Sequence, residues 1–474
     1  MPDILSVGID IGTSTTQVIF SRLMMENTSG YFSVPHVSIV DKDVVYKSEV
    51  YLTPLKTNVL IDTDKVRDIV SEEFRKAGFT PKDTKSGAVI ITGESARKEN
   101  SDAVLAKLSD FAGDFVVSAA GPDMESVIAG KGSGAFEYSM NEHCTVVNLD
   151  IGGGTTNIAV FDDGEVIARG CLDIGGRLIC VDRQMHVTKL SPAARAVSED
   201  AGIDIRENEK VSAYDLKKIT DRMADLIFDF LKGKKSRILS QIKTPGSSDF
   251  EVGKAIDCIC FSGGVADGIY HEKSDLFRFD DIGIMLGKSI RTSGLLTAYQ
   301  LIRAGETIRA TVVGAGTYTT TISGSTITYT KDIFPLKNIP VLKLNASEQS
   351  ACFLGHQKEV SDRVRWFMAQ SDAPLIILAM DGIKNPSYAQ VRIAAGCIGQ
   401  VMDECLEKKQ PVIVVIKNDI AKAIGQLIYQ YLKGRRQVVA IDSIAVDEGD
   451  YVDMGKPVMN GMVVPVVVKT LVFG

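Results

Sequence analysis

The stretch NLDIGGGTTNIAVF, residues 148–161, joins an apolar run, an acidic residue at its end, three glycines and a second apolar run. The same order occurs earlier, in GIDIGTSTTQVIF at residues 8–20. Asp150 lies 140 positions after Asp10, and the same gap-free shift places Gly152 on Gly12 and Thr155 on Thr15. An apolar run that is interrupted by turn residues and then resumes is typical of a β-hairpin. The repeat predicts two copies of one strand–turn–strand unit, each with a carboxylate ending its first strand.

The two acidic residues predict a metal and phosphate site. An unpaired carboxylate at the end of a buried strand is strongly disfavoured, so Asp10 and Asp150 need a partner. Magnesium suits them, because it takes one or two carboxylates together with water and phosphate oxygens. One such hairpin is also compatible with a plain β-turn, whereas two in register favour a cleft that holds a triphosphate and its metal from both sides. Backbone amides at glycines and nearby hydroxyls supply donors for phosphate. The predicted phosphate ligands are Gly12, Thr13, Ser14 and Thr15 on one side and Gly152, Gly153, Gly154 and Thr155 on the other.

Two further glycine pairs predict the nucleoside side of the same site. FSGGVADG, residues 261–268, follows an apolar strand and opens a helix, so Gly263 and Gly264 allow backbone to pack closely against an adenosine. CLDIGGRLICVD, residues 171–182, is expected to place Gly175 and Gly176 before a helix, as a wall on the ribose side. Either turn alone is more often structural. The order of all four motifs along the chain favours a nucleotide site.

Together these motifs resemble the superfamily of actin, sugar kinases and Hsp70-type ATPases. The resemblance covers residues 1 to about 330 and implies a duplicated α/β ATPase core, with halves at 1–140 and 141–334, that binds ATP and Mg²⁺. It implies that Asp10 holds the metal or polarises the attacking water, and that Asp150 holds magnesium through water. The two connecting helices of the superfamily are expected at AAGPDMESVIAGKGSG, residues 119–134, and at DDIGIMLGKSI, residues 280–290.

Two positions depart from the Hsp70 pattern. Hsp70 relatives carry an arginine that covers adenine shortly after the adenosine turn, where this chain has Asp267. Their first connecting helix starts with an acidic residue before proline, whereas Gly121 precedes Pro122 here, which leaves Asp123 or Glu125 as the substitute. These departures concern adenine preference and hydrolysis, and they leave the phosphate motifs intact.

Residues 335–474 carry no phosphate motif and are expected to form a third domain. The apolar runs PLIILAMDG (374–382), PVIVVIK (411–417) and QVVAIDSI (437–444) alternate with helical segments. This alternation predicts parallel strands in a separate α/β domain. The ending DMGKPVMNGMVVPVVVKTLVF (453–473) predicts apolar strands around a turn. Its residues Met454, Met459 and Met462 suit either core packing or an adaptable docking surface for a partner.

From end to end, the chain resembles the family of reactivating factors of ethanolamine ammonia-lyase. The stretches that carry this resemblance are VGIDIGTSTTQVIFSRL, AVIITGESARKENS, SAAGPDMESVIAGKGSGA, CLDIGGRLI and VDMGKPVMNGMVVPVVVKTLVF. The resemblance implies an ATP-dependent chaperone that opens its adenosylcobalamin-dependent partner, so that damaged cobalamin leaves and intact cofactor enters. The alternatives are a small-molecule kinase, for which Glu94 and Arg97 are the nearest polar candidates, and an activator of another radical enzyme. The scattered cysteines argue against such an activator.

Bulk properties exclude several other classes of protein. A chain of 474 residues is long enough for two or three domains, and its formal charge of −7 argues against nucleic acid as the main partner. The start MPDILSVGID lacks the basic stretch of a signal peptide, and no apolar run reaches the roughly 18–20 residues of a membrane span. A cytoplasmic location is therefore expected, with association to a bacterial microcompartment left open, as is a homodimer. The eight cysteines lack metal-type spacing and predict buried free thiols. Residues 232–253 are expected to form an exposed, mobile loop.

Overall fold

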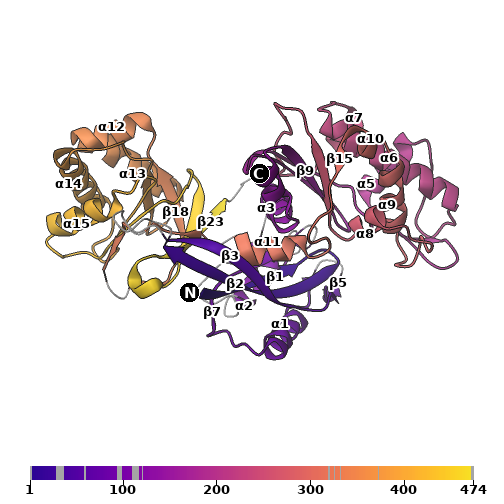
Figure 1. Ribbon diagram of the computed structural model, residues 1–474, viewed down its shortest axis with the longest axis horizontal. Helices are drawn as coiled ribbons and strands as arrows, with labels where there is room; N and C mark the ends of the chain where they lie inside the picture. The colour runs from indigo at the N-terminus through magenta and orange to yellow at the C-terminus, as the bar shows by residue number, and fades with distance from the viewer. Residues whose placement is uncertain are drawn as a thin grey trace.

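The computed structural model describes residues 3–27, 37–57, 60–92, 95, 99–108, 117–119, 121–318, 321–324, 326–330, 333–371 and 373–470. The chain forms three α/β units that lie side by side (Figure 1). The first unit, in indigo and purple, lies between the second unit and the orange and yellow C-terminal unit.

The first unit is built on a sheet with the strand order β3-β2-β1-β7-β8, and β4 pairs beside β2. β1 (Asp3–Ile11) and β2 (Thr15–Asn27) form the predicted hairpin, with Asp10 opposite Gln17. β7 (Thr84–Ile91) runs parallel to β1. Helix α1 (Thr63–Ala77) covers the sheet and ends at Gly78, whose φ of +75° suits glycine. The remaining elements are β3 (Val37–Lys47), β4 (Tyr51–Leu52), β5 (Leu55–Thr57), β6 (Leu60–Ile61), α2 (Ser101–Leu108) and β8 (Val117–Ala119).

The second unit repeats this plan in a sheet with the order β11-β10-β9-β14-β15. β9 (Thr145–Ile151) and β10 (Thr156–Asp162) form the second hairpin, with Asp150 opposite Asn157, and β14 (Cys258–Ser262) runs parallel to β9. Hairpin and parallel neighbour thus follow in the same order in both units, which confirms the duplicated actin-like core. The other elements are β11 (Glu165–Leu172), β12 (Ile179–Val181), β13 (Val187–Leu190), α5 (Pro192–Asp200), α6 (Ala213–Leu231), α7 (Arg237–Ile242), α8 (Ala266–Tyr270), α9 (Gly283–Thr292), α10 (Leu295–Ala298) and β15 (Gln300–Leu301).

Two helices cross between the halves at glycines (Figure 1). A Cβ atom at Gly132 of α3 (Pro122–Gly132) would overlap the carbonyl of Ala310, and one at Gly314 of α11 (Ala310–Tyr318) would overlap the carbonyl of Ile128. The backbones therefore touch directly, and α11 also packs on β1 and β2. Helix α4 (Ala135–Glu142) follows α3.

The position predicted for the second connecting helix was wrong. Residues 280–290 lie mainly in α9, which packs against α6 and α8 inside the second half, while α11 packs against α3. Apolar periodicity shows that a helix face is buried, but it does not show which neighbour covers that face.

Two local predictions in the second half were also wrong. The segment 232–253 contains helix α7, whose Ile238, Leu239 and Ile242 are buried in the main core, and is therefore not a mobile loop. Short apolar segments between polar residues gain this burial only from partners far away in the sequence. The pair Gly175–Gly176 leads into strand β12, which pairs with β13, and not into a helix.

The third unit is an α/β domain with one eight-stranded sheet, in the order β16-β23-β22-β18-β19-β20-β21-β17. The three strands predicted from its apolar runs are parallel: β19 (Ile377–Met380), β20 (Val412–Ile416) and β21 (Val438–Asp442). A fourth strand, β18 (Leu336–Lys343), runs parallel to β19. Separate apolar clusters fill its two faces. The other elements are α12 (Ala346–Leu354), α13 (Gln357–Ser371), α14 (Tyr388–Cys405), α15 (Ala421–Tyr431), β22 (Asp450–Met454), the turn η2 (Met459–Gly461) and β23 (Pro465–Thr470). β16 (Thr321–Ile322) and β17 (Thr328–Tyr329) belong to this sheet although they precede residue 335.

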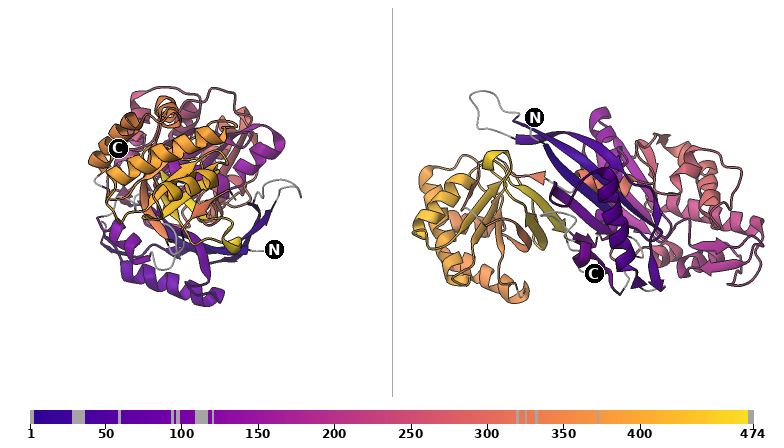
Figure 2. Two further views of the ribbon diagram at one scale, coloured as in Figure 1. Left: turned by 90° about the vertical axis from the view of Figure 1, so that its left-hand side faces the viewer. Right: turned by 90° about the horizontal axis from the view of Figure 1, so that it is seen from below.

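An apolar contact joins the third unit to the first. Leu23 and Met25 of β2 pack with Val463, and Met459 is partly buried against the same cluster. Figure 2 shows the third unit beside the ends of the indigo strands. Met454 is fully buried, whereas the side chain of Met462 is partly exposed. The methionines at the end of the chain therefore divide between core, domain junction and surface.

The cysteine prediction is confirmed for six of the eight thiols. All eight are free, and Cys144 and Cys405 are the two that are partly exposed. Throughout the described ranges, every helix is too short or too polar to cross a membrane.

Candidate functional site

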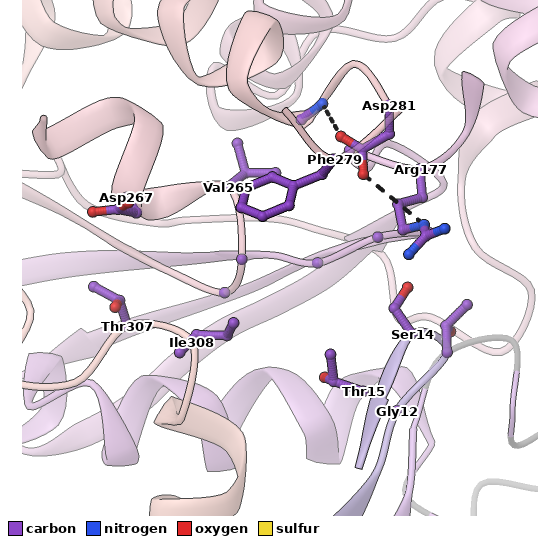
Figure 3. Close-up of a pocket in the computed structure, with 18 of the residues that line it drawn as sticks. Gly12, Ser14, Thr15, Arg177, Val265, Asp267, Phe279, Asp281, Thr307 and Ile308 are labelled. Atoms are coloured by element: carbon purple, nitrogen blue, oxygen red, sulfur yellow. Dashed lines mark hydrogen bonds and ion pairs between the residues drawn. The ribbon is translucent and has the colours of Figure 1, made fainter. Parts of the chain in front are cut away.

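A cavity of about 650 Å³ lies between the two halves of the core. The ends of both hairpins, the turn after β14 and the loop before α9 line it (Figure 3). The residues predicted to bind phosphate, metal and adenosine that lie on its wall are Asp10, Gly12, Thr13, Ser14, Thr15, Asp150, Gly152, Gly153, Gly154, Thr155, Gly176, Gly263 and Gly264. Gly175 is the exception. A Cβ atom there would lie 2.5 Å from the carbonyl oxygen of Gly153, so the backbone of Gly175 packs directly against the turn of the second hairpin.

The two hairpin turns have the same hydrogen bond. The amide of Gly12 donates to the carbonyl of Thr15 at 2.8 Å, and the amide of Gly152 donates to the carbonyl of Thr155 at 3.0 Å. The turns also approach each other, since a Cβ atom at Gly153 would lie 2.6 Å from Oγ of Ser14. Glycine at position 153 therefore allows this close approach. The two turns lie close together, and both line the cavity.

The carboxylate of Asp10 is buried at the end of β1. Burial raises its pKa to about 7, and the negative charge of Asp150 adds to this, while a hydrogen bond from Thr92 opposes it. Oγ1 of Thr92 donates to Oδ1 of Asp10 at 3.0 Å. Asp10 therefore ionises close to neutral pH.

Asp150 has the equivalent position in the second half. Burial raises its pKa to about 6, and hydrogen bonds from Ser262 and Thr311 oppose the shift. Oγ of Ser262 donates to Oδ1 of Asp150 at 2.6 Å. In both halves the hydroxyl comes from the parallel strand beside the hairpin or from the residue directly after it. Each carboxylate is thus fixed by its neighbouring strand.

Two buried carboxylates that face one cavity fit a divalent cation that shares its coordination with phosphate. Groups of three or more histidine, cysteine or acidic side chains that could hold a metal are absent from the described ranges. Magnesium needs no such group, because it keeps waters and binds through one or two carboxylates and substrate phosphates. Asp10 and Asp150 suit that pattern.

The end of the cavity that carries the predicted adenosine motif is built on the turn after β14. Gly263 has a φ of +82°, and a Cβ atom there would overlap the backbone of Ile151. The turn is thereby pressed against the end of the second hairpin, and the amide of Val265 donates to the carbonyl of Ile151 at 3.1 Å. Apolar side chains of Val265, Ile284 and Phe279 line this end. The site therefore offers glycine backbone and an apolar wall, as an adenosine needs.

Asp267, which stands where Hsp70 relatives have arginine, contacts two basic side chains that follow it in the chain. Its carboxylate lies 2.7 Å from Nζ of Lys273 and 2.9 Å from Nδ1 of His271. Lys273 and Arg278 also line the cavity, and the guanidinium of Arg278 lies 5.6 Å from the centre of the Phe279 ring. The loop before α9 thus supplies the cations and the aromatic ring at this end.

The structure separates the two acidic residues of the first connecting helix. Glu125 lines the cavity. Asp123 instead accepts hydrogen bonds from the amide and hydroxyl of Ser248 and lies 3.6 Å from Nε of Arg169. Glu125 is therefore the acid of α3 that faces the site. The kinase candidates Glu94 and Arg97 lie outside the described residues.

Sequence reasoning missed several residues of the cavity. Thr92 and Ser262 could have been found, because they stand at the ends of the strands that run parallel to the two hairpins. Phe279 and Arg177 carried no local signal. Arg177 reaches the site because its amide donates to the carbonyl of Gly153 at 2.7 Å, which fixes it against the second hairpin.

The family model described as ethanolamine utilisation protein EutA matches residues 2–474. This chain belongs to that family. It is 35% identical, over 480 residues, to the ethanolamine ammonia-lyase reactivase EutA of Salmonella typhimurium, with 99% of this chain and 98% of the relative covered. The protein of the same name from Escherichia coli is 35% identical over 473 residues, with the same coverage of both chains.

Solved structures resemble the chain over about two thirds of its length. The Aquifex aeolicus PPX-GPPA enzyme has a TM-score of 0.41 at 14% identity, covering 66% of this chain and 99% of its own. The ethanolamine utilization protein EutJ from Carboxydothermus hydrogenoformans has a TM-score of 0.33 at 15% identity, covering 67% of this chain and 90% of its own.

Proposed function

We propose that this protein is an ATP-dependent reactivase of ethanolamine ammonia-lyase. It opens the inactivated lyase so that damaged cobalamin leaves and intact adenosylcobalamin takes its place. The observation that carries the proposal is the identity of 35% over 99% of the chain with two proteins named as reactivases of that enzyme. The identity extends through the third domain, which the ATPase core does not need for its own site. The kinase and radical-activator alternatives are not favoured.

The cavity supports ATP as the energy source. The amides and hydroxyls of the two hairpins bind the phosphates, and the turn at Gly263 and Gly264 packs against the adenosine. Asp10 and Asp150 hold Mg²⁺, which neutralises phosphate charge when it is bound. Asp10, buried at the end of β1 on the cavity wall, is also placed to polarise the attacking water. Hydrolysis and product release then return the cavity to its nucleotide-free state.

Closure of the cavity provides the movement. Each half contributes one hairpin, and the halves are joined where α3 and α11 cross at Gly132 and Gly314. Nucleotide that contacts both hairpins favours the closed arrangement, and its loss favours the open one. The first half also packs against the third domain through Leu23 and Met25. Rotation of the first half therefore moves the third domain, which we assign as the part that handles the lyase.

The partner defines where the protein acts. As a reactivase it works beside the lyase, in the cytoplasm or in association with a bacterial microcompartment. A homodimer remains a prediction, as does the absence of nucleic acid among the partners.

The deciding experiment uses lyase that has been blocked with cyanocobalamin. Incubation with this protein, ATP, Mg²⁺ and adenosylcobalamin should restore ethanolamine deamination, and omission of ATP should prevent recovery. The variant Asp10→Asn serves as the control for hydrolysis. Failure of the complete mixture to restore activity would reject the reactivase assignment, and ATP-dependent phosphorylation of a small sugar would favour the kinase.

A further inference from the structure

Arg177 lies in the loop between β11 and β12, which is hydrogen-bonded to the turn of the second hairpin. The amide of Gly176 donates to the carbonyl of Gly152 at 2.9 Å, and the amide of Arg177 donates to the carbonyl of Gly153 at 2.7 Å. The arginine stem lies along the same loop, since a Cβ atom at Gly153 would be 3.5 Å from its Cβ and Cδ atoms. The backbone thus directs this side chain into the space where the two hairpins meet.

The guanidinium of Arg177 has a loose partner. Its Nε lies 3.9 Å from Oδ2 of Asp281, which is beyond hydrogen-bond distance, and 42% of the arginine side chain is exposed. Asp281 is itself engaged, because its Oδ1 accepts a hydrogen bond from the amide of Gly283 at 2.9 Å. Figure 3 shows the guanidinium beside Ser14, at the end of the cavity opposite Asp267. The donors of Arg177 therefore face the phosphate hairpins.

The other basic residues of the cavity wall belong to the nucleoside end. Lys273 is paired with Asp267 at 2.7 Å, and the guanidinium of Arg278 lies near the exposed ring of Phe279. Of the cations that line the cavity within the described ranges, Arg177 is the one whose backbone is hydrogen-bonded to a hairpin turn. A triphosphate keeps excess negative charge after one divalent cation has bound, and arginine binds phosphate through two parallel hydrogen bonds.

We propose that Arg177 binds the terminal phosphate of the nucleotide. Its guanidinium then leaves the carboxylate of Asp281, from which its Nε is 3.9 Å away, and contacts the phosphate instead. The inference rests on the proposed ATP site and adds the residue that distinguishes a triphosphate from a diphosphate. On this assignment the terminal phosphate lies where Ser14 and Gly153 meet, so Arg177 contributes to ATP binding and little to ADP binding. Nucleotide state is thereby sensed at the rim of the second hairpin.

The test compares Mg²⁺–ATP and Mg²⁺–ADP affinities by calorimetry for the full chain and for Arg177→Ala and Arg177→Lys. Losing charge-assisted hydrogen bonds to phosphate should weaken ATP binding by about 10- to 100-fold, and ADP binding by less than about 3-fold. Lysine keeps the charge but not the planar fork, so Arg177→Lys should recover part of the loss. The matched control is Lys273→Ala, which removes one positive charge from the same cavity and should leave the ratio of the two affinities unchanged.

The outcomes separate this inference from the proposed function. If the unmodified protein binds neither nucleotide, the ATP site itself is rejected. If it binds ATP and Arg177→Ala weakens ATP and ADP equally, or neither, Arg177 does not read the terminal phosphate. Melting curves without nucleotide should coincide for the unmodified protein and the two Arg177 variants, because the side chain of Arg177 is partly exposed and its hydrogen bond to the hairpin comes from the backbone.

Discussion

Replacing Asp10 by asparagine should raise the stability of the protein without nucleotide and should remove most of the stabilisation that nucleotide adds. The unfolded chain loses the Asp10 proton near pH 4, whereas the folded protein holds it up to a pKa of about 7. Between these values the folded state binds more protons, so stability falls as pH rises through this window. Asparagine cannot ionise, and its side-chain oxygen still accepts the hydrogen bond from Thr92.

The size of the effect follows from the pKa shift. A pKa raised from its usual value near 4 to about 7 corresponds to about 4 kcal/mol of destabilisation once Asp10 is ionised at pH 8, and to less than half of that at pH 5. The advantage of Asp10→Asn over the unmodified protein should therefore be about 2–3 kcal/mol larger at pH 8 than at pH 5. For a unit of this size, that is a difference of about 5–10 °C in Tm.

The assay is thermal unfolding at pH 5 and pH 8, with and without Mg²⁺–ATP. Mg²⁺–ATP should raise the Tm of the unmodified protein at pH 8, because a ligand bound only by the native state stabilises it. Asp10→Asn should show little of this increase and at least ~100-fold slower hydrolysis. The same change at exposed Asp68 of helix α1 should alter stability by less than about 0.5 kcal/mol. Equal Tm differences between variant and unmodified protein at both pH values would refute the argument that burial raises the pKa of Asp10.

Two other predictions follow from the arrangement of the domains and the site. Asp150→Asn should weaken Mg²⁺-dependent ATP binding about 10-fold more than metal-free ADP binding, because a metal contact is lost; equal losses in calorimetry would make Asp150 purely structural. A chain ending at residue 318 removes the whole eight-stranded sheet, including β16 and β17. It should still bind ATP but should neither restore the blocked lyase nor co-elute with it in size exclusion. Reactivation by this shortened chain would place the lyase contact in the core.

The sequence by itself determined the local features of this protein. Strand, carboxylate and glycine turn are all contained within each hairpin motif. Short stretches were therefore enough to place Asp10 and Asp150 at the ends of strands, and Gly12 and Gly152 in the turns. The end of helix α1 at Gly78 is equally local, because a left-handed glycine acts within a few residues. The duplication was visible because both copies kept the same spacing. The parallel strands of the third domain were predicted from the same kind of local pattern.

Tertiary structure decided every feature that depends on a distant partner. Helix α7 was hidden because the burial of Ile238 and Ile242 depends on the core around it. Only packing showed that Glu125 faces the cavity while Asp123 turns to Ser248, since both stand in the same turn of α3. Arg177 became part of the site through hydrogen bonds between two loops more than 20 positions apart along the chain. A sequence pattern shows that a residue is buried or turned, but the neighbour that gives it a role is supplied by the folded chain, because contact energies depend on distance in space and not on distance along the sequence.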